Sequence, residues 1–315
     1  MHLVLPFVHA TSPAAGQALS TLQLPNLEAL LARLAPLAGD DGHELSLSTP
    51  QERVLAAAHG WACADGLVPL AALAARADGL PVAAAPADWG WGLLSPTHWH
   101  VGTEQVSLTD PATLGLDDAT SRALFDAVRP LFEDDGWQLH WGAPSRWYAA
   151  HPSLATLPTA SLDRVIGRNV DWWLNMHGDA RWLRRLQAEV QMLLYTHPVN
   201  DTREARGLRP VNSFWLSGTG RTPPEAPPPA GLQLDDRLRA PALAEDWAAW
   251  AEAWAALEAG PLAQALARAE AGEAVQLSLC GERQALRLAP APPRSWWRRL
   301  IGPRRVHAAP LLATL

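Results

Sequence analysis

The chain has 315 residues, a length that suits one large or two medium domains. Hydrophobic residues make up 48% of it and charged residues 18%, so a folded core is expected and intrinsic disorder is not. A formal net charge of −7 argues against a protein that coats nucleic acid, and we predict no nucleic-acid partner. All 25 basic residues are Arg, so the choice of Arg over Lys carries no functional signal at any single position.

The two cysteines, Cys63 and Cys280, are far apart and fit no metal-binding or disulfide spacing, which favours a reducing, cytoplasmic location. The apolar start over residues 2–9 lacks a positively charged lead and contains Pro6, so we interpret it as a first strand rather than a signal peptide. No apolar stretch reaches the roughly 18–20 residues that a spanning helix needs, so no integral membrane segment is predicted.

Hydrophobic periodicity and turn signals predict helices and strands that alternate along the chain. In chain order we expect a strand over 2–9; helices over 26–37 (with Asn26 as the N-cap), 50–59 and 65–77; strands over 80–85 and 97–108; a helix over 117–132; two short strands within 137–148; helices over 161–166 and 179–196; a strand over 211–216; helices over 242–258 and 261–271; and a hairpin over 275–288 that turns at Gly281. Because long all-helix or all-strand blocks are missing from this series, the expected class is α/β.

The segment 222–231, TPPEAPPPAG, has the composition of a proline-rich loop or linker. It predicts a main α/β domain over 1–221 and a C-terminal part over 232–315 made of helices and a hairpin. That part has 84 residues and is rich in Ala, so its own core is thin. We therefore expect it to pack on the main domain.

Residues 187–220 carry the strongest pattern in the chain, and much of it has a structural interpretation. Pro198 disfavours helical geometry at the residue before it, so the long helix ends near Thr196. Asn200 is a plausible cap for the next helical turn, and Gly207 can end that turn in a left-handed conformation. A strand and a glycine turn over 217–220 follow.

The remaining polar residues of this segment suit an anion site. Arg203 and Arg206 lie about one helical turn apart, and Arg209 follows directly. A guanidinium fork donates paired hydrogen bonds to phosphate or carboxylate. The alternative is a solvated Arg face paired with Glu204 and Glu189. The candidate ligand-binding residues are His197, Asn200, Arg203, Arg206, Arg209 and Asn212.

The run HPVNDTREARGLRPVNSFWLSGTG over 197–220 is similar to the HPxNxxRxxxGxxPANxxxxxGxG segment of archaeal-type cofactor-independent phosphoglycerate mutases. It resembles still more closely the RpfE-type regulatory proteins of bacteria. Asp110-Pro111, Arg146-Trp147 and the Trp-Trp-Arg-Arg run at 296–299 agree with the bacterial family, whose resemblance covers roughly 90–300. The resemblance implies a reduced alkaline-phosphatase-like fold with a mixed, mostly parallel sheet flanked by helices.

The resemblance also implies chemistry that the residues do not fully supply. The mutases transfer phosphate through a Ser nucleophile and two divalent metals held by Asp and His. Such a site needs an acidic residue soon after the first strand, yet 7–12 reads FVHATS, and His307 is the only histidine after the central segment. We therefore expect no metal or other cofactor, assign no catalytic residue, and favour a regulatory or ligand-sensing protein that binds a small phosphorylated or carboxylated anion.

Two further hypotheses stay open. The first is an active mutase or phosphatase with an unconventional site around His98, His100 and Asp110, because two imidazoles on one strand face are an acceptable pair of metal ligands; Glu104 is a further possible ligand.

The second is a partner-binding module with a Trp-rich surface and a basic tail, although Trp247, Trp250 and Trp254 have the spacing of a core stripe. In the tail, a protein partner is possible through Trp296, Trp297, Arg298 and Arg299. Docking of the tail on this same protein is favoured over docking on a membrane.

Overall fold

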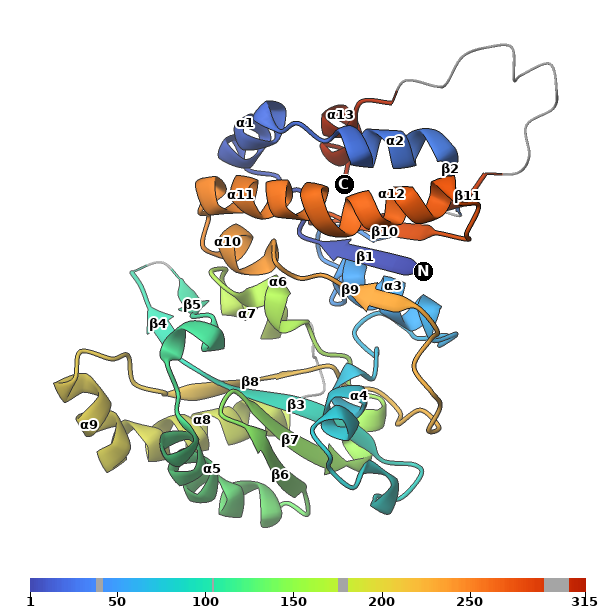
Figure 1. Ribbon diagram of the computed structural model, residues 1–315. Coiled ribbons are helices and arrows are strands. Elements are labelled where there is room, and N and C mark those ends of the chain that lie inside the picture. The colour runs from blue at the N-terminus through green and yellow to red at the C-terminus, as the bar shows by residue number, and fades with distance from the viewer. Residues whose placement is uncertain (38–41, 104, 175–180, 292–305) are drawn as a thin grey trace, which may run out of the picture. The chain divides into compact units, whose positions relative to one another are not determined.

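The computed structural model describes residues 1–37, 42–103, 105–174, 181–291 and 306–315 (Figure 1). Its contacts divide the chain into two compact units, which we call unit 1 (Met1–Ala62 with Pro227–Leu315) and unit 2 (Cys63–Ala226). This division differs from the expected boundaries of 1–221, 222–231 and 232–315, because the first strand takes its hydrogen-bond partners from the C-terminal third of the chain. Glu104 and the tail residues 296–299 lie outside the described residues.

Unit 1 is built on a five-stranded sheet with the strand order β2-β11-β10-β1-β9. The strand β1 (His2–Pro6) is parallel to β10 (Gln276–Cys280) on one side and to β9 (Leu232–Leu234) on the other. Antiparallel pairing then adds β11 (Ala285–Pro290) and β2 (Leu34–Pro36) at one edge. Residues 3–5 of β1 are buried, as expected for the centre of a sheet that is covered on both faces.

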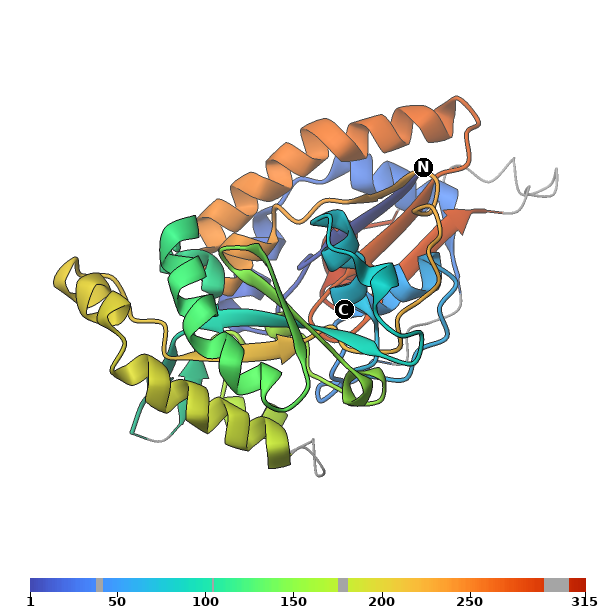
Figure 2. The ribbon, with the colours of Figure 1, turned by 90° about the horizontal axis from the view of Figure 1, so that it is seen from below.

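Helices cover both faces of the unit 1 sheet (Figures 1 and 2). Successive side chains of β1 point to opposite faces and therefore pack against different helices. Leu3 and Leu5 pack in the larger core with Trp250 and Trp254, whereas Val4 packs with Val54 of the helix α3. Both tryptophans are fully buried, which confirms their prediction as core residues. The helices of unit 1 are α1 (Pro13–Thr21), α2 (Pro25–Arg33), α3 (Pro50–Ala58), α10 (Arg239–Leu243), α11 (Trp247–Leu257), α12 (Ala263–Glu270) and α13 (Ala308–Leu312).

The start of α2 is capped by a residue that is remote in sequence. Asn26 was expected to be the N-cap, but the helix already begins at Pro25, which suits a first helical position because it has no amide to satisfy. The amides of Asn26 and Leu27 instead donate to the carboxylate of Glu258. Glu258 opens a π-helical turn (Glu258–Leu262) between α11 and α12 and is buried.

Unit 2 is built on a separate four-stranded antiparallel sheet with the order β6-β7-β3-β8. Its central strand β3 (Gly90–Thr97) lies between β7 (Arg146–His151) and β8 (Ser213–Ser217), and β6 (Gln138–Ala143) is at the edge. The short strands β4 (Trp99–Val101) and β5 (Val106–Leu108) form a hairpin of their own.

The helices of unit 2 cover its sheet on both faces. The helix α5 contacts the edge strand β6, α8 contacts the edge strand β8, and the two helices contact each other. The helix α4 contacts β3 and belongs to a second, separate apolar cluster (Figure 1). The helices are α4 (Leu70–Ala77), α5 (Asp118–Glu133), α6 (Leu162–Val165), α7 (Val170–Leu174), α8 (Arg181–Tyr195) and α9 (Pro198–Ala205), with short 3-10 turns η1 (Val82–Ala84), η2 (Pro111–Leu114) and η3 (Pro152–Ala155).

The expected α/β class with a mixed sheet flanked by helices is confirmed. Among the pairs between the described strands, those of β1 with β10 and β9 are parallel and the others are antiparallel. The segment 80–85, expected as a strand, contains the turn η1 instead. Within the described ranges, no helix combines the length and the apolarity that crossing a bilayer requires.

We expect the capping carboxylate of Glu258 to give the fold a measurable pH dependence. Burial raises the pKa of Glu258 above the ordinary glutamate value of 4.5, the charge of Glu28 adds to this rise, and the two amide donors oppose it. The folded state therefore holds the proton more tightly than the unfolded chain does. The stability that this linkage contributes is complete below pH 4.5 and is lost as pH rises through the higher folded-state pKa.

Urea unfolding of the wild type and Glu258→Gln at several pH values measures this contribution. The free energy of unfolding of the wild type, taken relative to the variant, should fall as pH rises through that window. Glu252→Gln on the exposed side of α11 is the control for the loss of one negative charge. A difference between wild type and Glu258→Gln that is constant with pH would contradict the assignment.

Candidate functional site

The central motif begins at the bend between α8 and α9. Pro198 occupies the first turn of α9, and the residue before it is extended and serves as the N-cap. That cap is His197, whose Nδ1 accepts a hydrogen bond from the amide of Val199 at 3.3 Å. The expected cap was Asn200, which lies inside the helix and has a different role.

Asn200 is a buried joint between the end of α8 and the start of β8. Its side-chain nitrogen donates to the carbonyl oxygens of Leu194 and Val211, both at 2.8 Å. Its side-chain oxygen accepts from the amide of Val211 at 2.9 Å. The side chain is 4% exposed, and both of its amide hydrogens are used by the backbone.

Arg203 is also buried and also bound to the backbone. Its Nε donates to the carbonyl of Arg209 at 2.9 Å, and its Nη2 donates to the carbonyl of Leu114 at 2.6 Å. Burial lowers the pKa of this guanidinium, and the nearby carboxylate of Asp117 opposes that shift. The guanidinium of Arg203 therefore links the loop after α9 to the end of η2 and does not face solvent.

The side-chain amide of Asn212 pairs with the backbone of Trp99 at the bend between β3 and β4, as a neighbouring strand would. Its side-chain oxygen accepts from the amide of Trp99 at 2.7 Å, and its side-chain nitrogen donates to the carbonyl of Trp99 at 2.9 Å. Its own amide donates to Thr97 at 3.1 Å. Asn200, Arg203 and Asn212 thus all serve to join backbone segments.

The other two guanidinium groups of the motif are exposed. Arg209 donates from Nη1 to the hydroxyl of Thr109 at 3.1 Å, at the end of β5. Arg206 follows α9 and lies in electrostatic range of Asp117. Hydrogen bonds from Thr120 lower the pKa of Asp117, and the charges of Arg206 and Arg203 add to this.

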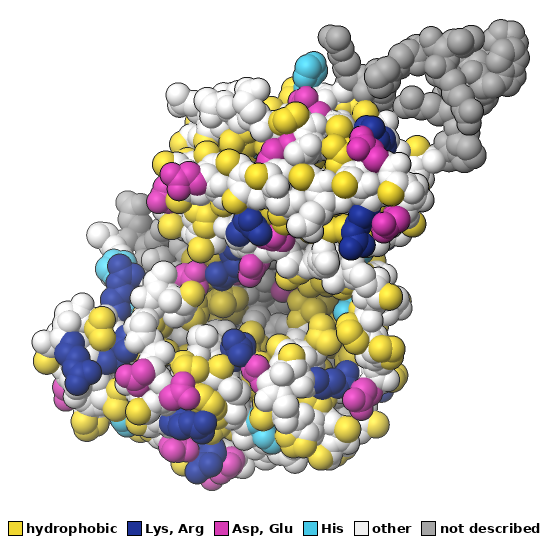
Figure 3. All heavy atoms as spheres, viewed as in Figure 1, with side chains coloured by type: hydrophobic (Ala, Val, Ile, Leu, Met, Phe, Trp, Pro, Cys, Tyr) yellow, Lys and Arg dark blue, Asp and Glu magenta, His cyan; other side chains and the backbone are white. Residues whose placement is uncertain are grey.

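Of the two histidines at the start of the β4–β5 hairpin, His98 lies in electrostatic range of the exposed Arg209. Nδ1 of His98 donates to the carbonyl of Pro210 at 2.9 Å, which leaves Nε2 as the ring nitrogen that titrates. Burial lowers the pKa of His98, the bond to Pro210 opposes this, the charges of Arg209 and His100 lower it further, and Glu204 raises it. Figure 3 shows Arg and His side chains gathered over α9 and the β4–β5 hairpin.

The possible metal ligands around these histidines are engaged elsewhere or lie outside the described residues. The carboxylate of Asp110 caps η2 by accepting from the amide of Ala112 at 3.0 Å. Across the described ranges, no three His, Cys, Asp or Glu side chains are grouped so as to hold a metal ion.

The glycines of the Ser217–Gly220 turn have a packing role. Gly218 and Gly220 have φ angles of +66° and +143°. A Cβ at Gly218 would lie 2.9 Å from the amide nitrogen of Ala71, and one at Gly220 would lie 2.6 Å from the carbonyl oxygen of Leu67. The turn therefore lets the end of β8 approach the start of α4, where the amide of Ala71 donates to Gly218.

One polar cluster escaped the sequence analysis because its members are distant in sequence. Arg146 donates from Nε and Nη2 to the carboxylate of Asp78 at 2.9 and 2.8 Å, and the hydroxyl of Tyr148 donates to the same carboxylate at 2.7 Å. The hydrogen bond from Arg146 is the main cause that lowers the pKa of Asp78. The cluster attaches the β6–β7 hairpin to the end of α4.

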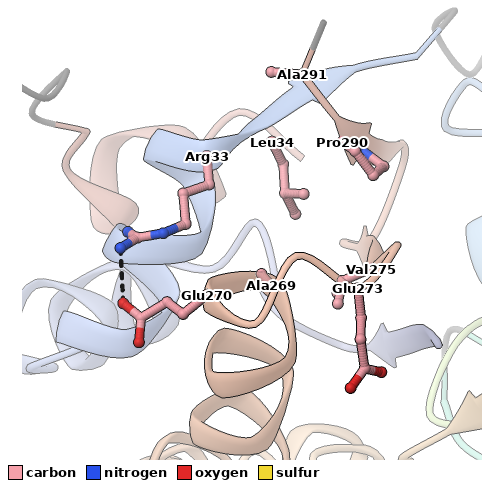
Figure 4. Close-up of a pocket in the computed structure, with 8 residues that line it drawn as sticks. All are labelled: Arg33, Leu34, Ala269, Glu270, Glu273, Val275, Pro290 and Ala291. Atoms are coloured by element: carbon pink, nitrogen blue, oxygen red, sulfur yellow. Dashed lines mark hydrogen bonds and ion pairs between the residues drawn. The ribbon is translucent and has the colours of Figure 1, made fainter. Parts of the chain in front are cut away.

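A cavity of about 340 Å³ lies in unit 1, and no motif residue lines it (Figure 4). Arg33 and Leu34 line one side, and Ala269 and Glu270 line another. Arg33 is already paired with Glu270 at 2.7 Å, so the charges at this mouth largely neutralise each other.

Comparison with known proteins gives likenesses in structure only. No family model matches the chain, and no curated protein matches it in sequence. The PH0037 protein from Pyrococcus horikoshii is 12% identical over 93% of this chain and 88% of its own, with a TM-score of 0.45. The cofactor-independent phosphoglycerate mutase from Thermoplasma acidophilum DSM 1728 is 12% identical over 91% of this chain and 89% of its own, with a TM-score of 0.37.

The contacts of the motif predict effects of very different size on stability for two nearby arginines. Arg203→Ala should lower the free energy of unfolding by about 2–4 kcal/mol, because two carbonyl oxygens lose their charged donor in a buried place. Arg206→Ala, on the exposed side of the same helix end, should change it by less than about 0.5 kcal/mol. Urea unfolding of the two variants checks this, and equal effects would contradict a structural role for Arg203.

Proposed function

We propose that this chain is a cytoplasmic ligand-sensing protein, related to cofactor-independent phosphoglycerate mutases but without their two-metal phosphoryl-transfer site. Its ligand is a small phosphorylated or carboxylated anion. The observation that supports this most directly is the exposure of two arginines in unit 2, Arg206 and Arg209, which follow the buried Arg203 in the chain. We call Arg206, Arg209, His98 and His100 the basic group.

The basic group has the chemistry that an oxyanion needs. The exposed guanidinium groups of Arg206 and Arg209 can donate paired hydrogen bonds to phosphate or carboxylate oxygens. His98 is held by Pro210 with its Nε2 edge free to respond to a charge placed near Arg209. His197 remains a candidate contact as well, since its Nε2 is not used by the N-cap hydrogen bond.

The buried members of the motif support the site indirectly. Arg203 holds the carbonyl of Arg209, and so fixes the backbone from which the Arg209 side chain extends. Asn212 holds Trp99, the residue between the two histidines. We therefore narrow the ligand contacts to the basic group and His197, and treat Asn200, Arg203 and Asn212 as positioning residues.

The absence of phosphoryl-transfer chemistry is part of the same proposal. The residues that follow β1, Phe7 to Ser12, contain no carboxylate where the mutases need a metal ligand. In the basic group, His98 and His100 are two possible ligands, but Asp110 is committed to capping η2.

A thermal-shift titration with 2-phosphoglycerate and 3-phosphoglycerate tests the ligand. The wild type should show a saturable rise in melting temperature, because a ligand that binds only the folded state stabilises it by about 2.7 kcal/mol at 100 times its Kd. The double variant Arg206→Ala/Arg209→Ala should lose most of the response. Arg129→Ala on α5 is the matched control for loss of a surface Arg in the same unit. If neither compound shifts the wild type, or if the double variant responds fully, the proposal fails.

A coupled mutase assay with and without added Mn²⁺ tests the absence of catalysis, and we expect no turnover above the buffer rate. Metal analysis of the purified protein accompanies the assay. Tightly bound manganese or zinc, together with turnover that His98→Ala abolishes, would instead favour an active mutase or phosphatase with an unconventional site at His98 and His100.

A further inference from the structure

The loop that follows β1 in unit 1 lies where α/β sheets commonly hold ligands. The strands β9, β1 and β10 are parallel, so their carboxyl ends share one edge of the sheet. The chain leaves β1 through Phe7, a non-glycine residue with a φ angle of +59°. The carbonyl of Phe7 accepts from Nε1 of Trp250 at 3.0 Å, which helps to hold this costly conformation.

An internal carboxylate already lies on this loop. One oxygen of Glu282 accepts hydrogen bonds from the amide of Thr11 at 2.8 Å and from its hydroxyl at 2.7 Å. The next residue, Ser12, caps α1 by accepting from the amide of Ala15 at 3.2 Å. The bound oxygen is therefore held by the residue just before the N-cap of α1, close to a helix start where the dipole favours negative charge.

A buried histidine on the same loop lacks a partner. His9 is 9% exposed, and within the described part of the chain its Nδ1 has no hydrogen-bond partner. Burial lowers the pKa of His9, and the charge of Glu282 opposes this, so the ring lies in electrostatic range of that carboxylate. A buried polar nitrogen without a hydrogen-bond partner costs free energy, so its presence needs an explanation. One explanation is that this nitrogen donates its proton to a bound anion.

We propose that the β1–α1 loop, residues 7–12, is an oxyanion-binding site that the chain fills with its own Glu282 carboxylate. A small free oxyanion such as inorganic phosphate competes with Glu282 for the amide and hydroxyl of Thr11, and it also takes a hydrogen bond from the imidazole of His9, whose Nδ1 is unpartnered among the described residues. Thr11 is exposed, so a ligand can reach these donors from solvent. The site lies in unit 1 and does not depend on the ligand proposed for the basic group of unit 2.

The alternative is that Glu282 only braces the loop. The two roles of Glu282 predict different results when its carboxylate is removed. If the role is only structural, the protein becomes less stable whatever anion is present. If Glu282 occupies an anion site, phosphate binds the emptied site and restores the stability that was lost.

The test uses the full chain with Arg206→Ala/Arg209→Ala, so that phosphate bound by unit 2 does not contribute. In that background, Glu282→Ala should gain a saturable rise in melting temperature with phosphate, of about 2–4 °C near ten times its Kd, relative to sodium chloride of equal ionic strength. With Glu282 present the response should be much smaller. Adding Thr11→Val to Glu282→Ala should weaken the phosphate response. A Glu282→Ala protein that responds to phosphate no more than its parent, or a response unchanged by Thr11→Val, would overturn the site.

A second measurement keeps the proposal testable if Glu282→Ala does not fold. The imidazole of His9 is titrated by NMR in the wild type and in Glu282→Gln, with His9→Asn used to assign its signal. Loss of the carboxylate charge should lower the pKa of His9, and added phosphate should raise it again in Glu282→Gln. A His9 pKa that responds to neither change would show that the ring does not face an anion site.

Discussion

The amide side chain of Asn200 is the contact on which the geometry of the central motif depends. It holds the last turn of α8 through Leu194, and it holds both backbone groups of Val211, two residues before β8. Each of these groups is buried, and each would cost roughly 1–3 kcal/mol if left without a partner. This side chain therefore adds buried hydrogen bonds to the apolar packing between the long helix and the sheet of unit 2, and an apolar residue could not supply them. Arg203 and Asn212 repeat the same principle at the two ends of the adjoining loop.

Local signals predicted much of the secondary structure, but they contained little about which strands pair. The helix α3 begins as expected at Thr49-Pro50, where Thr49 and Glu52 form a capping box. The strand β3 was missed because most of its residues are buried on both faces, so it shows no alternation of polar and apolar residues. The parallel pairing of β1 with β10 joins Leu3 to Leu277, and no local pattern records a partner at that separation. The division of the chain after Ala62 and Ala226 differs from the expected boundary at 221 for the same reason, since a proline-rich segment does not show which parts of the chain pack together.

The motif residues show why the chemistry of the site was only partly predictable. A guanidinium fork matches two carbonyl oxygens as well as it matches a phosphate, so the sequence identifies a donor without identifying its acceptor. For Arg203 the acceptors are the carbonyls of Arg209 and Leu114. The spacing of the HPVN segment is consequently explained by the needs of the fold before any ligand is considered. The exposed arginines had the same residue type and the same spacing, and only burial distinguishes them from Arg203.

Burial of Arg203 also bears on how well exposed cations can bind. Long side chains such as Arg206 and Arg209 lose rotamer freedom when they hold a ligand, and salt screens their charges, so an exposed pair on a loose loop binds weakly. Here the loop backbone is already fixed, because the carbonyl of Arg209 accepts a hydrogen bond from the buried Arg203. The guanidinium of Arg209 is itself hydrogen-bonded to the hydroxyl of Thr109. Only the outer parts of the side chains remain to be ordered, and a fixed backbone lowers the entropy cost of binding. The buried hydrogen bonds that explain the motif structurally are therefore also what make an anion site on its surface physically reasonable.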